Sequence, residues 1–301
     1  MNGVIVINKE EDFTSFDVVA VVRRTLHTKK VGHCGTLDPN ATGVLPVLVG
    51  NATKAQDIIV NHDKSYVATF KLGLTSDTLD IWGEVAEENG PDIKKEELEK
   101  ALKNFVGDIL QVPPMYSAVQ KDGVRLYELA RQGIEVEREA RPVTIYSLEL
   151  NDFDEKAQCG TLTVSCSKGT YIRTLISDIA KSLGTNGIMT SLVRTSACGF
   201  TLSQAITLSE LKELAQNGEV ENHLLSLESL FESYSELFVS EKQTVRFRNG
   251  NPLDIERTEL KDIKPADGTV YRVKSGEGEF LALGVVDLEK GVLKIYKHFG
   301  K

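Results

Sequence analysis

The sequence has few of the features that mark redox, disulfide-rich or metal-dependent proteins. Its 301 residues include one tryptophan, three methionines and four cysteines, Cys34, Cys159, Cys166 and Cys198. No two cysteines form a C-x-x-C pair, and their spacings match no zinc template. We interpret them as reduced thiols of a cytoplasmic protein. The chain also offers no Gly-rich phosphate loop and no ligand set, so we expect no metal and no organic cofactor.

Long hydrophobic runs are absent as well. No apolar stretch approaches the ~18 residues that a membrane-spanning helix needs. The N-terminus enters a strand pattern at Val4–Ile7 without a basic leader or a cleavage site, which argues against a secretory signal. Hydrophobic residues still make up 41% of the chain, enough for a sizeable core.

Positive charge is in short supply, with a formal net charge of -9, which by itself argues against a nucleic-acid partner. Residues 203–241 contain eight glutamates and one lysine and therefore carry -7 of this charge. The rest of the chain is close to neutral and contains two basic clusters, between Arg23 and His33 and between Arg125 and Arg141. The negative balance therefore does not exclude RNA.

Hydrophobic periodicity predicts a large first domain, residues 1–235, in which strands and helices mix. Strands are expected near 3–8, 44–49, 65–74, 106–112, 143–153, 160–167 and 188–197. Helices are expected from Thr14 or Ser15 to Leu26, from an Asp92 cap to Asn104, and over 171–183.

Two further segments differ from this pattern. Residues 113–142 begin with Pro113-Pro114 and contain a hairpin signal at Asp122-Gly123, followed by a short helix over Val124–Gln132, which together predict a protruding insertion. Residues 203–235 form an acidic, helical connector. Short strands separated by turns then predict a small second domain over 236–301.

The chemistry-bearing feature is a glycine-punctuated run around one acid, Asp38. Pro39 disfavours helix at Asp38, and Gly35 and Gly43 permit positive φ or a close backbone approach. We expect this run to hold a single carboxylate rigidly at the mouth of a cleft. An ordinary Asp-Pro turn is the alternative when the dipeptide is considered alone.

This run, GHCGTLDPNATG over residues 32–43, resembles the active-site motif of the TruB family of tRNA pseudouridine synthases at every fixed position of G-H-x-G-x-L-D-P-x-A-x-G. The resemblance implies a mixed α/β fold around a large, mostly antiparallel sheet, with a small C-terminal PUA-like β-barrel. It implies that Asp38 is catalytic and that His33 enters the T-loop of tRNA and stacks where bases have flipped out. On sequence alone, His33 could equally be plain surface.

A second block, Lys168–Thr174, is similar to the family's K-G-x-Y-I-R motif. Thr170 is a candidate N-cap, which would place Arg173 in the first helical turn, where the helix dipole disfavours a cation. Such an arginine needs an anion, unless it simply bends into solvent. The resemblance implies that Arg173 pairs with Asp38 and that Tyr171 belongs to the substrate site.

Two shorter blocks complete the catalytic resemblance. Lys64-Ser65-Tyr66 resembles a K-x-Y motif, which implies that Tyr66 is catalytic, stacking on the target base and taking part in proton transfer, with Lys64 nearby. Ser191–Thr195 resembles an L-x-R block, which implies that Leu192 closes the base pocket and that Arg194 helps to bind RNA. Alone, either block would be an ordinary strand.

The N-terminal block departs from the family's N-K-P-x-G-x-T-S pattern. Residues 8–15 read NKEEDFTS, so acids replace the proline and the glycine, while Lys9 is kept as a candidate substrate contact. The resemblance of the C-terminal domain to a PUA-like domain implies that it contacts the tRNA acceptor stem, and Lys242, Arg246 and Arg248 are the candidate phosphate contacts.

The resemblance implies a stand-alone enzyme that isomerises the T-loop uridine at tRNA position 55. It would break the N-glycosidic bond, rotate the base and rejoin it through C5. We expect a monomer with no obligatory protein partner. The alternatives are a non-catalytic tRNA-binding or folding chaperone on the same scaffold, a hydrolase of nucleosides or glycosides, and a relative that works inside a guide-RNA particle.

Overall fold

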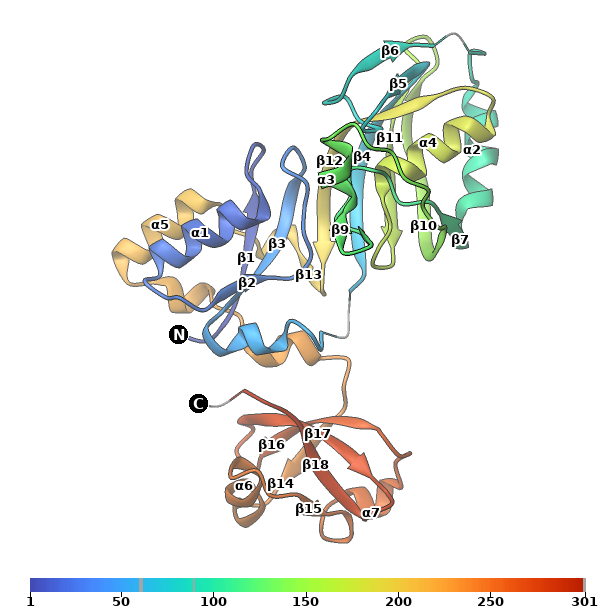
Figure 1. Ribbon diagram of the computed structural model, residues 1–301. Coiled ribbons are helices and arrows are strands. Elements are labelled where there is room, and N and C mark those ends of the chain that lie inside the picture. The colour runs from blue at the N-terminus through green and yellow to red at the C-terminus, as the bar shows by residue number, and fades with distance from the viewer. Residues whose placement is uncertain (60–61, 89, 300–301) are drawn as a thin grey trace.

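The computed structural model of the protein describes residues 1–59, 62–88 and 90–299, and two sheets organise them (Figure 1). In this part of the chain the first sheet consists of β1 (Gly3–Lys9), β2 (Val31–His33), β3 (Thr42–Val49), β4 (Lys64–Leu72), β7 (Gly107–Gln111), β10 (Arg141–Asp154), β11 (Cys159–Cys166), β12 (Gly187–Ala197) and β13 (Phe200–Thr201). The second consists of β14 (Glu236–Val239), β15 (Leu253–Asp254), β16 (Val270–Ser275), β17 (Phe280–Asp287) and β18 (Val292–His298).

Two short ribbons and seven α-helices accompany the sheets in the described residues. The ribbons pair β5 (Leu74–Ser76) with β6 (Val85–Glu87) and β8 (Gln120–Lys121) with β9 (Val124–Arg125). The helices are α1 (Ser15–Thr25), α2 (Lys95–Leu102), α3 (Leu126–Ala130), α4 (Ile172–Ser182), α5 (Leu208–Asn217), α6 (Glu241–Arg248) and α7 (Leu260–Ile263). No helix among these residues is both long enough and apolar enough to cross a membrane.

The strand order of the large sheet is β1-β3-β12-β4-β11-β10-β7, with β2 paired to β3 and β13 to β12. Every pair is antiparallel except β3 with β12, which confirms the mixed α/β fold around a mostly antiparallel sheet. That parallel pair joins Thr42 and Gly43 to Val193 and Arg194. It thereby places the end of the Asp38 run beside the Leu192–Arg194 block.

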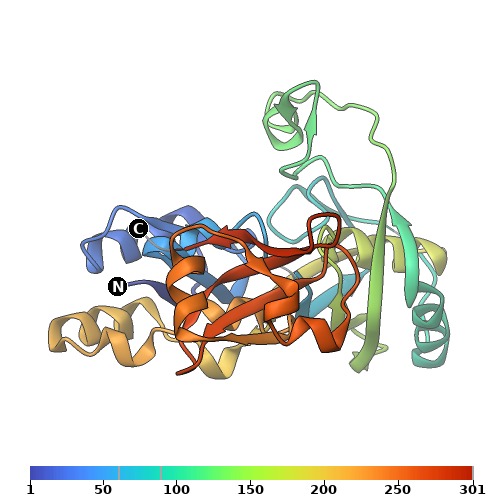
Figure 2. The same ribbon diagram turned by 90° about the horizontal axis from the view of Figure 1, so that it is seen from below.

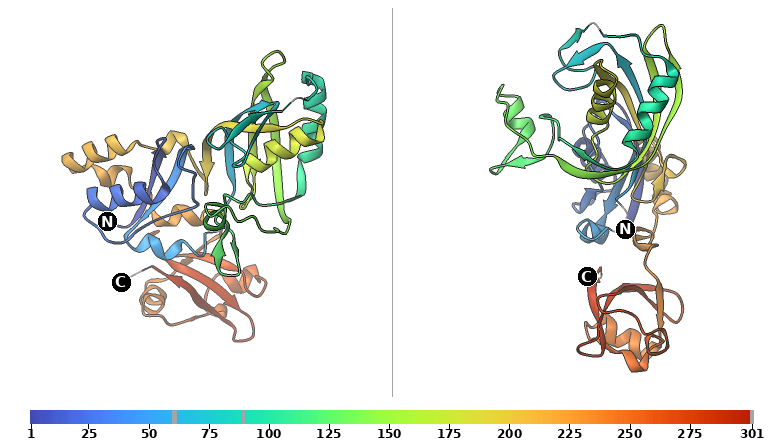
Figure 3. Two further views of the ribbon diagram at one scale, coloured as in Figure 1. Left: turned by 45° about the horizontal axis from the view of Figure 1, so that its top comes forward. Right: turned by 90° about the vertical axis from the view of Figure 1, so that its right-hand side faces the viewer.

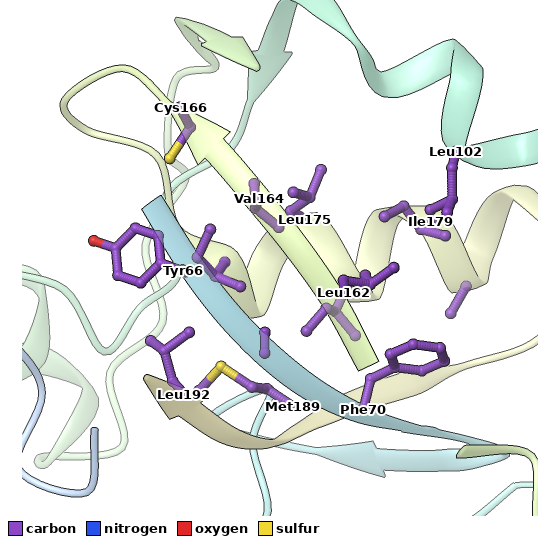
Figure 4. Packing of buried hydrophobic residues seen from close by; sticks show 14 of the residues in the cluster. Tyr66, Phe70, Leu102, Leu162, Val164, Cys166, Leu175, Ile179, Met189 and Leu192 are labelled. Atoms are coloured by element: carbon purple, nitrogen blue, oxygen red, sulfur yellow. The ribbon is translucent and has the colours of Figure 1, made fainter. Parts of the chain in front are cut away.

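Helices cover the large sheet in two places. α1 and α5 lie beside the β1–β3 half, whereas α2 and α4 pack on the half formed by β4, β11 and β10 (Figure 1). Alternate residues of β4 are buried, as predicted, and pack with the apolar stripe of α4 (Figure 4). The sheet and α4 therefore form one continuous core beneath the site described below.

The insertion projects from the body of the first domain (Figures 2 and 3). Its hairpin confirms the Asp122-Gly123 signal, because both residues have positive φ, 52° and 83°, as a two-residue type I′ turn requires. The predicted helix over 124–132 is too long, since Val124 and Arg125 pair in the hairpin and α3 begins only at Leu126.

Two predicted helix caps are wrong. The N-cap of α2 is Lys94, not Asp92, and that of α4 is Tyr171, not Thr170. The Thr170 hydroxyl donates to the Ser167 carbonyl at 3.0 Å. The Gln111 side chain binds both backbone polar groups of Tyr171, at 2.8 Å and 3.1 Å, and so holds the start of α4. Arg173 is therefore the second residue of the helix, still in its first turn.

The second sheet has the order β14-β16-β17-β18-β15 and curls into an open half-barrel rather than a closed one, which fits a PUA-like domain. The preceding connector contains α5 and short 3-10 turns. An ion pair of 2.9 Å between Arg272 of β16 and Glu228 of the connector ties the second domain to it.

Candidate active site

The Asp38 loop runs from β2 into β3, and its glycines are required by geometry. Gly35 and Gly43 have φ of 79° and 105°, values that favour glycine. A Cβ atom on Gly43 would lie 2.2 Å from the Arg194 carbonyl oxygen across the parallel pair. The last glycine of the motif therefore allows β3 to meet β12.

Buried cations hold the backbone of this loop from beneath. Lys9 is fully buried, and its ammonium donates to the carbonyls of Pro39 (2.7 Å), Phe13 (2.7 Å) and Glu10 (2.8 Å). Ser15 adds a second clamp, because its hydroxyl accepts from the Leu37 N–H at 2.9 Å and donates to the Leu37 carbonyl at 3.1 Å.

Arg194 completes this support. It is also fully buried, and its guanidinium donates to the carbonyls of Val44 (2.7 Å), Thr36 (3.2 Å) and Gly35 (3.2 Å). Sequence reasoning expects Lys9 and Arg194 to contact substrate. Their burial and their bonds to loop carbonyls instead assign both side chains to positioning Asp38, since neither side chain is exposed to a bound RNA.

Arg173 forms the ion pair that the sequence predicts. Its side chain is only 8% exposed, and Nη2 lies 3.0 Å from Oδ2 of Asp38. The same guanidinium donates to the carbonyls of Thr78 (3.0 Å) and Tyr116 (3.1 Å). One arginine thus joins the Asp38 loop, the loop after β5 and the start of the insertion.

A second carboxylate, Asp80, was missed by sequence reasoning. Its Oδ2 lies 3.3 Å from Nη1 of Arg173, and its side chain is 11% exposed against 49% for Asp38. The Thr78 hydroxyl and the Trp82 N–H donate to its other oxygen, at 2.6 Å and 3.1 Å. The only signal was a polar run, SDTLD over residues 76–80, with no match to the Asp38 motif.

The two carboxylates are therefore not equivalent. Asp80 is buried, fully hydrogen-bonded and fixed, whereas Asp38 is half-exposed and faces open space. The Arg173 guanidinium lies between them and forms an ion pair with each. Such an arrangement can present one charged carboxylate oxygen, in a defined position, to a bound molecule.

That open space is a cavity of about 670 Å³. It falls within the ~300–1,000 Å³ that small-molecule sites usually occupy. Asp38, Arg173, Tyr66, Leu192, Lys64 and Tyr171 all line it, so the structure brings six of the predicted site residues together. Lys9, Arg194 and His33 do not line it.

Tyr66 and Leu192 lie at one end of the apolar core, and the Tyr66 hydroxyl points away from the aliphatic side chains (Figure 4). Tyr66 is 6% exposed. Burial raises the pKa of its phenol to about 12, with the nearby Arg194 acting in the opposite sense. The phenol is therefore neutral at physiological pH. Burial, and next the charge of Arg194, lower the pKa of Lys64.

His33 lies outside the cavity, and its ring meets Phe16 edge-on, with centroids 5.6 Å apart. Burial and the charge of Arg194 lower the pKa of this imidazole. His33 is therefore a neutral aromatic group near the cavity mouth, not a cation.

The insertion adds a basic and aromatic rim. Tyr116, Tyr127, Arg125 and Arg131 all line the cavity. The two guanidinium carbons lie 5.9 Å and 5.4 Å from the centroid of the Tyr127 ring. Aromatic faces flanked by arginines are typical of surfaces that bind unpaired nucleic-acid bases. Within residues 1–59, 62–88 and 90–299, no three His, Cys, Asp or Glu side chains are grouped as metal ligands.

Comparison with known proteins gives concordant results. A family model described as "TruB family pseudouridylate synthase (N terminal domain)" matches residues 23–172, and one described as "tRNA pseudouridylate synthase B C-terminal domain" matches residues 173–232. The chain is 48% identical to the "tRNA pseudouridine synthase B" of Clostridium perfringens (strain 13 / Type A) over 292 residues, 97% of each chain. It is 45% identical to the protein of that name from Alkaliphilus oremlandii (strain OhILAs), covering 83% of this chain and 82% of the relative.

Among solved structures, "Crystal Structure of a Cbf5-Nop10-Gar1 Complex" contains a similar chain, with a TM-score of 0.75 and 24% identity. The match covers 99% of this chain and 85% of that one. At this identity the likeness concerns the fold, including both sheets.

Proposed function

Because the chain belongs to the TruB family of pseudouridylate synthases, we propose that it converts one uridine of tRNA, the T-loop uridine at position 55, to pseudouridine. The observation that supports this proposal best is the Asp38–Arg173 ion pair at the wall of a cavity lined by aromatic and basic side chains.

The reaction is an isomerisation, so every atom of the base is retained apart from exchanged protons. The N1–C1′ bond breaks, the base rotates, and a C5–C1′ bond forms. The hydrogen on C5 then leaves as a proton, and N1 gains one. Asp38 begins this sequence by attacking the sugar or the base or by taking a sugar proton. All three routes need a charged carboxylate presented to the substrate, as Arg173 presents Asp38.

The remaining residues bind and orient the base in this proposal. The target uridine must leave its stack, because its reacting atoms are inaccessible in folded RNA. Tyr66 stacks on the flipped base, and its neutral phenol can exchange a proton with it. Leu192 closes the other side of the pocket, and Lys64 and Tyr171 contact the nucleotide at the rim. Asp80 also lines the cavity, and its role is to fix Arg173.

We also propose that residues 1–235 form the catalytic domain and 236–301 a PUA-like RNA-binding domain. The 113–142 insertion would grip the T-arm through its arginines, while the second domain contacts the acceptor stem. Lys242, Arg246 and Arg248, on α6, are the candidate phosphate contacts there. The expected monomer without an obligatory protein partner, located in the cytoplasm, belongs to the same proposal.

The direct test measures tritium release from a T-stem-loop transcript that carries [5-³H]uridine. The wild-type chain and Asp38→Asn are compared, with hairpin binding measured for both. Release by the wild type alone, with binding retained by the variant, supports the reaction and the role of Asp38. Binding without release by either protein would favour a non-catalytic RNA chaperone. Released free base would indicate a hydrolase instead.

A further inference from the structure

Phe16 is an exposed aromatic side chain that the catalytic role of the site does not explain. It is the second residue of α1, and 70% of its surface is accessible, whereas Val18, Val19 and Val22 of the same helix are buried. It nevertheless lines the cavity that contains Asp38. An apolar ring held at the edge of a polar site is available for a ligand.

The position of Phe16 relative to Asp38 is fixed by two clamps on neighbouring residues. Ser15 binds both backbone polar groups of Leu37, the residue before Asp38. Lys9 binds the carbonyls of Phe13 and Pro39, both at 2.7 Å. The start of α1 and the catalytic loop therefore behave as one body, and a group resting on Phe16 has a set distance from Asp38.

The ring also has a fixed neighbour. His33 meets it edge-on, with an interplanar angle of 87°. His33 is partly buried, and burial lowers its pKa, so the imidazole does not place a charge against the phenyl ring. The pair forms an aromatic corner, Phe16 and His33, beside the cavity mouth.

We propose that Phe16 is a stacking platform for an unpaired RNA base other than the target uridine. The inference rests on the proposed function and extends it by naming a second base-binding position. A nucleobase is the occupant that fits, because the cavity rim supplies arginines for phosphates and aromatic faces for bases. Proteins recognise unpaired RNA bases by stacking them on such rings. A fixed platform would hold the loop open while the target base occupies the pocket.

The test compares Phe16→Ala and Phe16→Trp with the wild type on a T-stem-loop transcript carrying [5-³H]uridine. Ile263→Ala is the matched control, because Ile263 is also exposed, at 54%, but lies on α7, away from the cavity. We expect Phe16→Ala to raise KM roughly 5- to 100-fold, the usual effect of losing one stacked base. Its kcat should stay within about twofold of wild type, and Phe16→Trp and Ile263→Ala should retain the wild-type KM.

A second measurement follows stacking directly. Transcripts with 2-aminopurine at one unpaired loop position at a time are bound to each protein, and base fluorescence is recorded. The proposal expects one position that is quenched by wild type and Phe16→Trp but not by Phe16→Ala. No such position, an unchanged KM for Phe16→Ala, or a Phe16→Trp variant as impaired as the alanine variant would each overturn it. If wild type binds the hairpin but releases no tritium, the proposed reaction fails, while the fluorescence experiment still decides the role of Phe16.

Discussion

Asp80→Asn tests whether the buried carboxylate positions Arg173 for catalysis. The amide oxygen can still accept from the Thr78 hydroxyl and the Trp82 N–H, which now bind Oδ1. The amide nitrogen, however, takes the place of Oδ2, 3.3 Å from Nη1 of Arg173. A buried ion pair is thereby replaced by two opposed donors, with almost no change in shape.

The magnitude follows from burial. Arg173 and Asp80 have side chains only 8% and 11% exposed, so solvent screens their interaction weakly. Breaking a buried pair by removing one partner costs about 3–5 kcal/mol. Arg173 keeps Asp38 and two carbonyl acceptors, so we expect a smaller loss, about 2 kcal/mol, at the transition state. That loss corresponds to a roughly 30-fold decrease in kcat. KM should change little, because the Asp80 side chain is only 11% exposed and both of its oxygens already have protein partners.

Tritium release under saturating and limiting RNA separates kcat from KM for this variant. Asp77→Asn is the matched control, since Asp77 lies in the same loop and accepts from two neutral donors, the Glu84 N–H and the Tyr116 hydroxyl. Urea denaturation shows whether Asp80→Asn is folded in the assay. The reasoning is refuted if folded Asp80→Asn keeps kcat within about threefold of wild type, or if its defect lies entirely in KM.

Three other predictions concern the loop and its surroundings. Burial lowers the pKa of Lys9 from 10.5 to about 8, so deprotonation above that pH should loosen the Asp38 loop and lower kcat. The free energy of unfolding should not fall over the same pH range. Between about pH 8 and 10.5, Lys9 is deprotonated in the folded protein but still protonated in the unfolded chain, so rising pH favours the folded state through this residue. A pH–rate profile without a limb near 8, or one that simply tracks unfolding, would contradict this. His33→Ala should weaken hairpin binding roughly 5- to 100-fold and leave single-turnover chemistry at saturating RNA nearly unchanged; an equal loss in both would assign His33 to catalysis. Gly43→Ala should lower the free energy of unfolding by about 3 kcal/mol or more, against about 1 kcal/mol for Gly169→Ala. Both glycines have positive φ, but a Cβ atom on Gly43 would lie 2.2 Å from a backbone oxygen, whereas one on Gly169 would meet nothing within 4 Å. Similar urea midpoints for the two variants would show that β3 and β12 can move apart at little cost.

The sequence predicts the elements of the first domain well because apolar residues on a buried face recur with the period of the strand or helix. Alternate apolar residues in β4 and the stripe on α4 each reflect one buried face, and the structure confirms both. The residues of a loop show no such hydrophobic periodicity. The N-cap of α4 depends on Gln111, which lies 60 residues from Tyr171, so no local pattern could reveal that Thr170 is not the cap.

The candidate site was predictable where a motif carried it and not elsewhere. The Asp38–Arg173 pair follows from two motifs, whereas the contact of Asp80 with Arg173 spans 93 residues and belongs to none. Lys9 and Arg194 show a different limit. A cation in a sequence is expected at the surface, and only the fold reveals that loop carbonyls surround these two.

The parallel pair of β3 and β12 also determines when, during synthesis, the chain can first form its active site. The bond from Arg194 to the Val44 carbonyl joins residues 150 positions apart. A nascent polypeptide that has emerged only as far as α4 already contains Asp38 and Arg173. It still lacks β12, whose Arg194 binds carbonyls of the Asp38 loop and whose Leu192 lines the cavity. Contacts of such long sequence separation form late, because a large loop must close first. The active site therefore cannot form before β12 has been made, about two thirds of the way along the 301-residue chain, and we expect a chain that terminates before this strand to be inactive rather than partly active.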